Sequence, residues 1–179
     1  MSSDSLTNSH NTGCGGAGAS AAITAADCGR KVLIIDRYDG GGSTRRSGGV
    51  VYFGGGTDLQ SASNVTDSVS QMFRYISKEN GGVSKPETIR RFCEESASNF
   101  RWLERRCQVR FRDERGKVKV YPDKTSYPPS DISLYRSGNE TTSTPRGHRV
   151  LGEYLTGNIL YEALHKQLES HPNITIATH

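Results

Sequence analysis

The sequence is poor in apolar residues and contains no long apolar run. Hydrophobic side chains make up 33% of the 179 residues, and after Met1 the first twelve residues contain only Leu6 as an apolar side chain. A bilayer-spanning helix needs about 20 consecutive apolar residues, and a secretory signal needs an apolar stretch near its start. The sequence therefore predicts no membrane span and no secretory signal, and we expect a cytoplasmic protein.

The spacing of the cysteines and the net charge also indicate no special function. None of the four cysteines forms a C-x-x-C pair or a metal-like spacing with the five histidines, so we predict free thiols and no metal site. The net charge is only +4, which is compatible with an anionic cofactor. Arginines cluster between residues 90 and 112, but Glu94, Glu95 and Glu104 share the same helical face. This mixture favours a solvated helix over a nucleic-acid surface.

The strongest pattern present is a glycine-rich turn followed by a helix and a strand. Gly13, Gly15 and Gly18 have G-x-G-x-x-G spacing, an alanine-rich run follows, and the apolar segment 31–36 ends in Asp36. In a dinucleotide site such glycines permit a tight turn, a close backbone approach to the pyrophosphate and close helix packing. The helix N-terminus binds the phosphates, and the acid accepts hydrogen bonds from the ribose.

A flexible surface loop is the alternative, because glycine is abundant here (20 residues). The alanine-rich helix, the apolar strand and the acid at its expected offset together favour a cofactor site. An acid at this position also favours the unphosphorylated ribose of FAD or NAD over NADP. The residues assigned to the cofactor on this ground are Gly13, Gly15, Gly16, Ala17, Gly18, Asp36 and Arg37.

The segment after the acid distinguishes between these two cofactors. Residues 40–56 read GGGSTRRSGGVVYFGGG, and this resembles the flavin-binding loop of the fumarate reductase/succinate dehydrogenase flavoprotein and 3-oxosteroid 1-dehydrogenase-like family. The resemblance implies that Ser43 and Thr44 bind the diphosphate or ribityl chain of FAD, and that Ser47, Gly48 and Gly49 pass beside the isoalloxazine. A glycine linker is the alternative, but its β-prone VVYF interior argues against one. An NAD-dependent dehydrogenase, which needs no such loop, is the other enzyme hypothesis.

The resemblance implies an FAD-dependent oxidoreductase that transfers hydride between flavin and a C–C or C=C bond next to a carbonyl of a small-molecule substrate. No histidine lies in the loop at 40–56, so the FAD is expected to be non-covalent. His148 is expected at the surface, and Tyr121, Tyr127 and Tyr135 lie in a suggestive region, but no catalytic residue is assigned. In that family the cap domain and much of the flavin site come later. We therefore expect a truncated fragment, and a catalytically inactive remnant is the competing hypothesis.

The predicted fold class is α/β, a Rossmann-like dinucleotide-binding fold with a parallel sheet. Its parts are a polar segment 1–12, the fingerprint and flavin loop 13–60, inserted helices, hairpin and loops 61–150, and a final helix and strand 151–179. The polar first segment predicts a first strand that is weak or absent, because a central strand is normally apolar. The other predicted elements are helices at 15–28, 84–105 and 156–168, a further helix that is capped by Asp67 and ended by Asn80-Gly81-Gly82, a hairpin around 113–116, and parallel neighbouring strands at 31–36 and 174–177. The sequence predicts no oligomeric state.

Overall fold

The computed structural model describes residues 9–112, 126–127 and 144–178. The chain forms two compact units, the first comprising residues 1–49 and 152–179 and the second comprising residues 50–151. The boundaries between the predicted segments, at 60/61 and 150/151, stay predictions. Among the described residues, no helix has both the length and the apolar character needed to cross a membrane.

The first unit contains a parallel three-stranded sheet in the order β1-β2-β6. Its strands are β1 (Ser9–Thr12), β2 (Val32–Asp36) and β6 (Ile174–Thr178), and its helices are α1 (Gly16–Asp27), α2 (Gly42–Arg46) and α6 (Gly157–Ser170). Strands β2 and β6 pair in parallel, with Val32 opposite Ile174. The predicted parallel neighbours are therefore confirmed, as is the α/β fold class.

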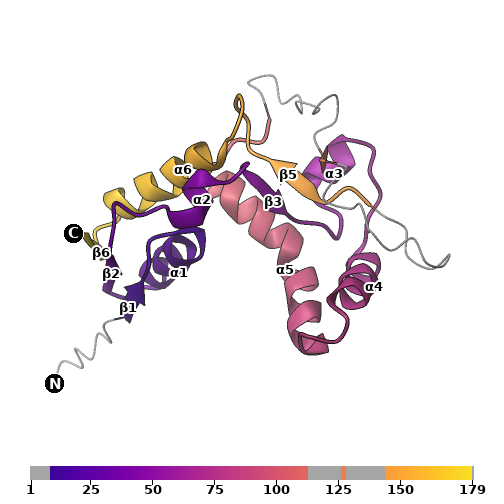
Figure 1. Cartoon of the computed structure of the whole chain (residues 1–179), viewed down its shortest axis with the longest axis horizontal. Helices are drawn as coiled ribbons and strands as arrows, with labels where there is room; N and C mark the ends of the chain where they lie inside the picture. Colours follow the sequence, from indigo (N-terminus) through magenta and orange to yellow (C-terminus); the bar gives the residue numbers. More distant parts are fainter. Residues whose placement is uncertain (1–8, 113–125, 128–143, 179) are drawn as a thin grey trace. The chain divides into compact units, whose positions relative to one another are not determined.

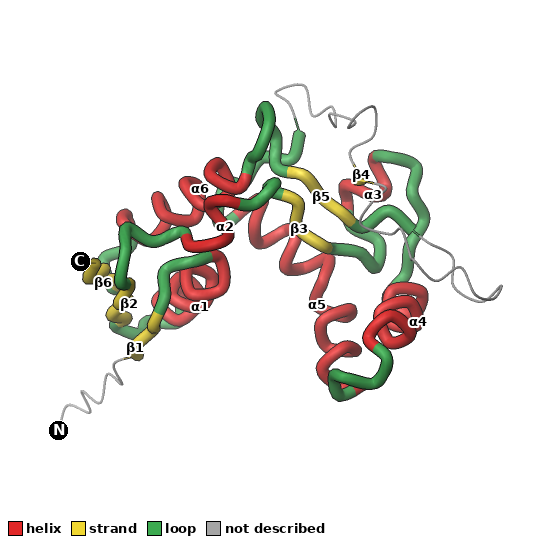
Figure 2. Tube along the Cα trace, viewed as in Figure 1, coloured by secondary structure: helices red, strands yellow, loops and turns green. Residues whose placement is uncertain are grey.

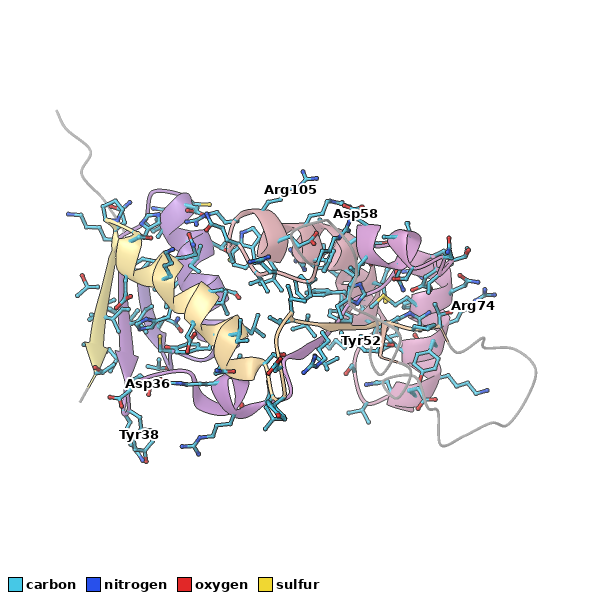
Figure 3. The ribbon with its side chains drawn as sticks, turned by 90° about the horizontal axis from the view of Figure 1, so that it is seen from above. Asp36, Tyr38, Tyr52, Asp58, Arg74 and Arg105 are labelled. Atoms are coloured by element: carbon cyan, nitrogen blue, oxygen red, sulfur yellow. The ribbon has the colours of Figure 1, made fainter. Side chains whose placement is uncertain are left out.

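Helices α1 and α6 pack on one face of this sheet (Figures 1 and 3). Alternate side chains of a strand point to opposite faces. Accordingly, Val32 and Ile34 are buried, whereas the next residue, Ile35, is 45% exposed. The alanines of α1 that face the sheet, Ala19, Ala22 and Ala26, are at most 2% exposed. Small side chains let this helix lie close to the strands that carry the loops described below.

Strand β1 forms although its sequence, Ser-His-Asn-Thr, is polar. It pairs in parallel with β2, and the peptide N–H groups of Ser9 and Gly13 donate to the carbonyls of Lys31 and Ile35 at the two ends of the ladder. The Asn11 side chain donates to the Gly18 carbonyl of α1 at 2.6 Å. Of the two predicted alternatives, an absent first strand is therefore wrong, and a weak first strand forms. Backbone hydrogen bonds do not require apolar side chains, and Asn11 adds one of its own.

In its described residues, the second unit contains an antiparallel sheet and three helices (Figure 2). Its strands occur in the order β3-β5-β4, with β3 at Val50–Tyr52, β4 at Ser126–Tyr127 and β5 at Gly147–Arg149. Its helices are α3 (Asp58–Ala62), α4 (Val69–Asn80) and α5 (Pro86–Arg105). Met72 of α4 packs with Ile89 and Cys93 of α5 in a buried cluster.

Helices α4 and α5 were predicted within a few residues, but the cap of α4 differs. Ser68, not Asp67, is the N-cap, and its hydroxyl accepts from the Gln71 N–H. Helix α3 was not predicted, although Thr57 and Gln60 form a capping box whose T-x-x-Q signature is visible in the sequence. The predicted hairpin at 113–116 and the tyrosines Tyr121 and Tyr135 lie outside the described residues.

Candidate functional site

The loop between β1 and α1 has the backbone that its glycines were predicted to provide. Gly13 has φ of +96°, which favours glycine, and a Cβ on Gly18 would collide with the Gly13 carbonyl oxygen. A Cβ on Gly15, in contrast, would have no neighbour closer than 3.7 Å, the Gly41 carbonyl oxygen. Gly18 is therefore needed for folding, whereas a Cβ at Gly15 would make only ordinary van der Waals contacts.

The second glycine loop, residues 40–49, lies against the first. The Gly41 N–H donates to the Cys14 carbonyl at 2.8 Å, and the Gly16 N–H donates to the Thr44 hydroxyl at 3.0 Å. Helix α2 forms within this loop, directly after Gly41, which has φ of +85°. Two segments that were identified from separate motifs are thus joined by hydrogen bonds between their backbones and the Thr44 side chain.

Asp36 lies at the carboxyl end of β2. It hydrogen-bonds to the first glycine loop and to the segment that leads into the second. Its Oδ2 accepts from the Cys14 N–H at 2.6 Å, and its Oδ1 accepts from the Tyr38 N–H at 2.9 Å. These backbone hydrogen bonds, that of Cys14 first, lower the pKa of Asp36 below its usual value. An ionised carboxylate has about four acceptor positions, so Asp36 retains the capacity to accept hydrogen bonds from ribose hydroxyls.

A groove of about 1150 Å³ opens beside Asp36. Its lining carries charges of both signs and consists of Asp36, Tyr38, Asp39, Gly40, Gly42, Ser43, Arg45, Arg46 and Asn158. The Tyr38 side chain is 70% exposed and extends from the loop after β2 into solvent (Figure 3). This groove is large enough to hold a small-molecule ligand, and its arginines suit an anionic one.

The structure brings some predicted cofactor residues to this groove and places others behind it. Asp36 and Ser43 line the groove. The hydroxyl of Ser47 instead donates to the Thr44 carbonyl at 2.9 Å, and the Gly48 carbonyl accepts from the Thr156 hydroxyl at 3.1 Å. The residues at 47–49 therefore lie against the start of α6, and their predicted contact with a flavin ring stays a prediction.

Several groove residues were missed or undecided at the sequence level. Arg45 and Arg46 lie within the loop at 40–56 but were not assigned to the cofactor, and both line the groove. Tyr38 and Asp39 directly follow the predicted site and could have been found by extending it. Asn158 belongs to α6, far away in the sequence, and no local signal marks it.

The second unit contains a buried polar cluster. Arg146 donates to Asp67 through Nε and Nη2, each at 2.8 Å, and both side chains are 0% exposed. Burial raises the pKa of Asp67, but hydrogen bonds from Arg146, Gly55 and Gln60 outweigh this and lower it overall. The two charges therefore neutralise each other inside the fold.

His148 belongs to the same cluster, and its predicted surface position is wrong, since it is 0% exposed. Its Nδ1 lies 2.8 Å from the Arg146 carbonyl, an acceptor, so Nδ1 carries the proton and Nε2 accepts from the Thr57 hydroxyl at 2.7 Å. Burial lowers the pKa of His148 to about 4. No group of three or more potential metal ligands occurs in the described part of the chain.

Comparison with known proteins places this architecture in a family. The sequence profile of the FAD binding domain family matches residues 12–179. The chain is 39% identical over 172 residues to a 3-oxo-5-alpha-steroid 4-dehydrogenase of Comamonas testosteroni, covering 89% of this chain and 31% of that protein. It is 34% identical over 93 residues to a cytochrome-type fumarate reductase of Shewanella frigidimarina, covering 51% of this chain and 16% of that protein.

Solved structures agree with these sequence matches. A 3-ketosteroid-delta4-(5alpha)-dehydrogenase from Rhodococcus jostii RHA1, in complex with 4-androstene-3,17-dione, matches with a TM-score of 0.78 and 25% identity, covering 99% of this chain and 40% of that one. A flavocytochrome c3 fumarate reductase shares the fold, with a TM-score of 0.71 and 22% identity, covering 95% of this chain and 27% of that one. The chain thus spans less than half the length of each of these relatives. The resemblance inferred from the two glycine motifs is confirmed, and so is FAD as the cofactor in place of NAD.

Proposed function

The chain belongs to the FAD binding domain family, and on that premise we propose that it holds FAD in the groove beside Asp36 as the cofactor-binding part of an oxidoreductase. The observation that carries this proposal is the junction of the two glycine loops at the carboxyl end of the parallel sheet. In open α/β sheets, ligands bind outside the carboxyl ends of the strands. Here that place contains Gly15, which presents no Cβ, the Asp36 carboxylate and the arginine-bearing groove.

Several of the residues present have the chemistry that FAD binding requires. Asp36 would accept hydrogen bonds from the adenosine ribose, and the exposed Tyr38 ring lies beside it in the groove lining. The start of α1 would offer backbone N–H groups to the pyrophosphate, and Gly15 has no Cβ to obstruct this approach. Arg45, or its neighbour Arg46, would neutralise a phosphate charge. The loop 47–49, which contacts the start of α6, would lie on the flavin side.

When bound, FAD supplies the redox chemistry, accepting or donating a hydride at a substrate carbon next to a carbonyl. This chain's residues bind and orient the cofactor, and no described residue is assigned a role in proton transfer. The curated relatives are named as a steroid dehydrogenase and fumarate reductases, so we propose a small molecule with a C–C or C=C bond next to a carbonyl as substrate. A catalytically inactive remnant that keeps the cofactor fold is the second hypothesis.

Two measurements on the purified chain test these proposals separately. A yellow protein with bound-flavin absorbance, releasing intact FAD on denaturation, supports a non-covalent FAD site. Protein that stays colourless and does not bind added FAD contradicts it. We expect no turnover of an enone or of fumarate with a reduced dye from these 179 residues alone, and measurable turnover would refute the inactive-remnant hypothesis.

A further inference from the structure

We propose that Tyr161 is a positioning residue for the cofactor groove, holding both glycine loops in place through its hydrogen bond to Cys14. This inference rests on the proposed function, since it assigns the pair a role at the same FAD site. Tyr161 lies on α6, whereas Cys14 occupies the second position of the first glycine loop. The Tyr161 hydroxyl donates to the Cys14 sulfur at 3.3 Å.

Cys14 is the residue through which the parts of the groove are connected. Its N–H donates to the Asp36 carboxylate at 2.6 Å, and its carbonyl accepts from the Gly41 N–H at 2.8 Å. Its side chain is directed inward, since the residue is only 1% exposed. A contact that fixes the Cys14 side chain therefore also fixes the peptide groups that orient Asp36 and the second loop.

Tyr161 also contacts the second loop directly. A Cβ on Gly40, whose φ is +77°, would collide with the Tyr161 hydroxyl, and a Cβ on Gly41 would lie 3.0 Å from the ring carbon Cδ1. The turn at these glycines thus closes over the tyrosine with no room for side chains. Tyr161 itself is 3% exposed, so its ring and hydroxyl lie beneath the two loops rather than in the groove.

The pair is suited to positioning and not to chemistry. Burial raises the pKa of Tyr161 and, partly offset by the hydrogen bond from Tyr161, also raises the pKa of Cys14. Both groups are therefore neutral at physiological pH, so the phenol donates and the thiol sulfur accepts. A buried neutral thiol is a poor nucleophile. The positive charge of the site therefore comes from the helix N-terminus and the arginines. The Tyr161–Cys14 pair only fixes the positions of the two loops.

A double-mutant cycle with conservative substitutions tests this role. Tyr161→Phe keeps the ring and removes the hydroxyl, and Cys14→Ala removes the acceptor. Each should weaken FAD binding by about threefold to tenfold, the range expected for one hydrogen bond, and the double variant should be no weaker than either single variant. Cys14→Ser, which retains an acceptor, should bind FAD within about twofold of wild type. The exposed Tyr154 provides the matched control, and Tyr154→Phe should leave FAD affinity unchanged.

Hydrogen exchange of the apo protein provides a second readout that does not depend on FAD. Peptides covering 13–18 and 40–46 should exchange faster in Tyr161→Phe than in wild type, while the α5 peptides stay unchanged. Equal FAD affinity and equal exchange in wild type and Tyr161→Phe would overturn the positioning role, as would additive losses in the double variant. If wild type binds no FAD, the proposed function fails, and the exchange comparison alone then decides the role of Tyr161.

Discussion

Two aspartates, one in each unit, show how the same carboxylate serves opposite purposes. Asp67 is fully enclosed, and its oxygens accept from Arg146, Gln60 and the Gly55 N–H. Asp36 accepts from backbone N–H groups at the end of a strand, and its other side faces a groove of about 1150 Å³. The pKa of each is lowered, but only Asp36 is open to a ligand.

The comparison teaches that a lowered pKa alone does not identify a binding residue. In Asp67 the hydrogen-bond donors all come from the chain itself, so its charge is used for folding. In Asp36 the same backbone interactions leave acceptor positions directed toward a groove lined by arginines. Geometry and exposure therefore separate a structural acid from a ligand-binding one, and substitutions at the two sites should separate stability from binding.

The largest expected effect is the loss of stability on removing Asp67. Asp67→Ala leaves the buried Arg146 guanidinium without its carboxylate, which costs about 3–5 kcal/mol in the free energy of unfolding. Chemical denaturation measures this loss. Asp58, whose side chain is 49% exposed and lies 3.8 Å from Arg101, is the matched control, and Asp58→Ala should cost about 1 kcal/mol or less. Equal losses in both variants would contradict the structural role of Asp67.

The next effect is a pH dependence of stability that comes from His148. Its folded pKa of about 4 lies below its ordinary value of 6.5, so the unfolded chain binds a proton that the folded chain excludes. This contribution to stability is complete above pH 6.5 and is lost as the pH falls from 6.5 to 4, by about 3 kcal/mol. Denaturation at several pH values measures it. The carboxylate of Asp67 titrates below this window, because its pKa is lowered from 3.8.

His148→Asn provides the control for this pH dependence. An asparagine can keep the donor to the Arg146 carbonyl but does not titrate. The variant should be less stable than wild type at neutral pH because it loses the bond with Thr57. Its stability should nevertheless change little between pH 6.5 and 4. A variant that keeps the full slope in this range would show that other groups cause it.

The smallest of the three effects is the loss of FAD affinity in Asp36→Ala. Removing this carboxylate should weaken binding by about 1–3 kcal/mol, the loss expected for charge-assisted hydrogen bonds, while the folded state persists. Asp39 lines the same groove and is the matched control. Asp39→Ala should not weaken binding, because a negative charge at this position repels an anionic cofactor and its removal lessens that repulsion. Fluorescence titration with FAD measures both, and equal weakening would contradict a specific ribose contact at Asp36.

Much of the fold could be predicted because local patterns determine it. The spacing of Gly13, Gly15 and Gly18 predicted the turn into α1, and the apolar run ending at Asp36 predicted β2. Strand β1 was underestimated because its pairing depends on backbone hydrogen bonds and on Asn11, which a polar sequence does not signal. Sequence patterns detect apolar burial better than they detect backbone pairing.

The candidate site was predictable only in part. Ser43 and Asp36 were identified from motifs and line the groove. Tyr161 was not, because its partner Cys14 lies 147 positions away in the sequence, and neither residue type predicts the other. The burial of His148 was missed for the same reason, since its partner Thr57 lies on a distant segment. Such contacts become visible only when the fold brings the segments together.

The central claim is that the first glycine loop cradles the pyrophosphate of FAD at Gly15. Titration of wild type and Gly15→Val with FAD tests it most directly, because a Cβ at this position has no neighbour closer than 3.7 Å and should be tolerated by the fold. Ala21, which is exposed on α1, provides a control that introduces the same side chain, Ala21→Val. The account predicts stabilities within about 1 kcal/mol of wild type for both variants, loss of detectable FAD binding in Gly15→Val, and wild-type affinity in Ala21→Val. Equal FAD affinity in wild type and a folded Gly15→Val would contradict it.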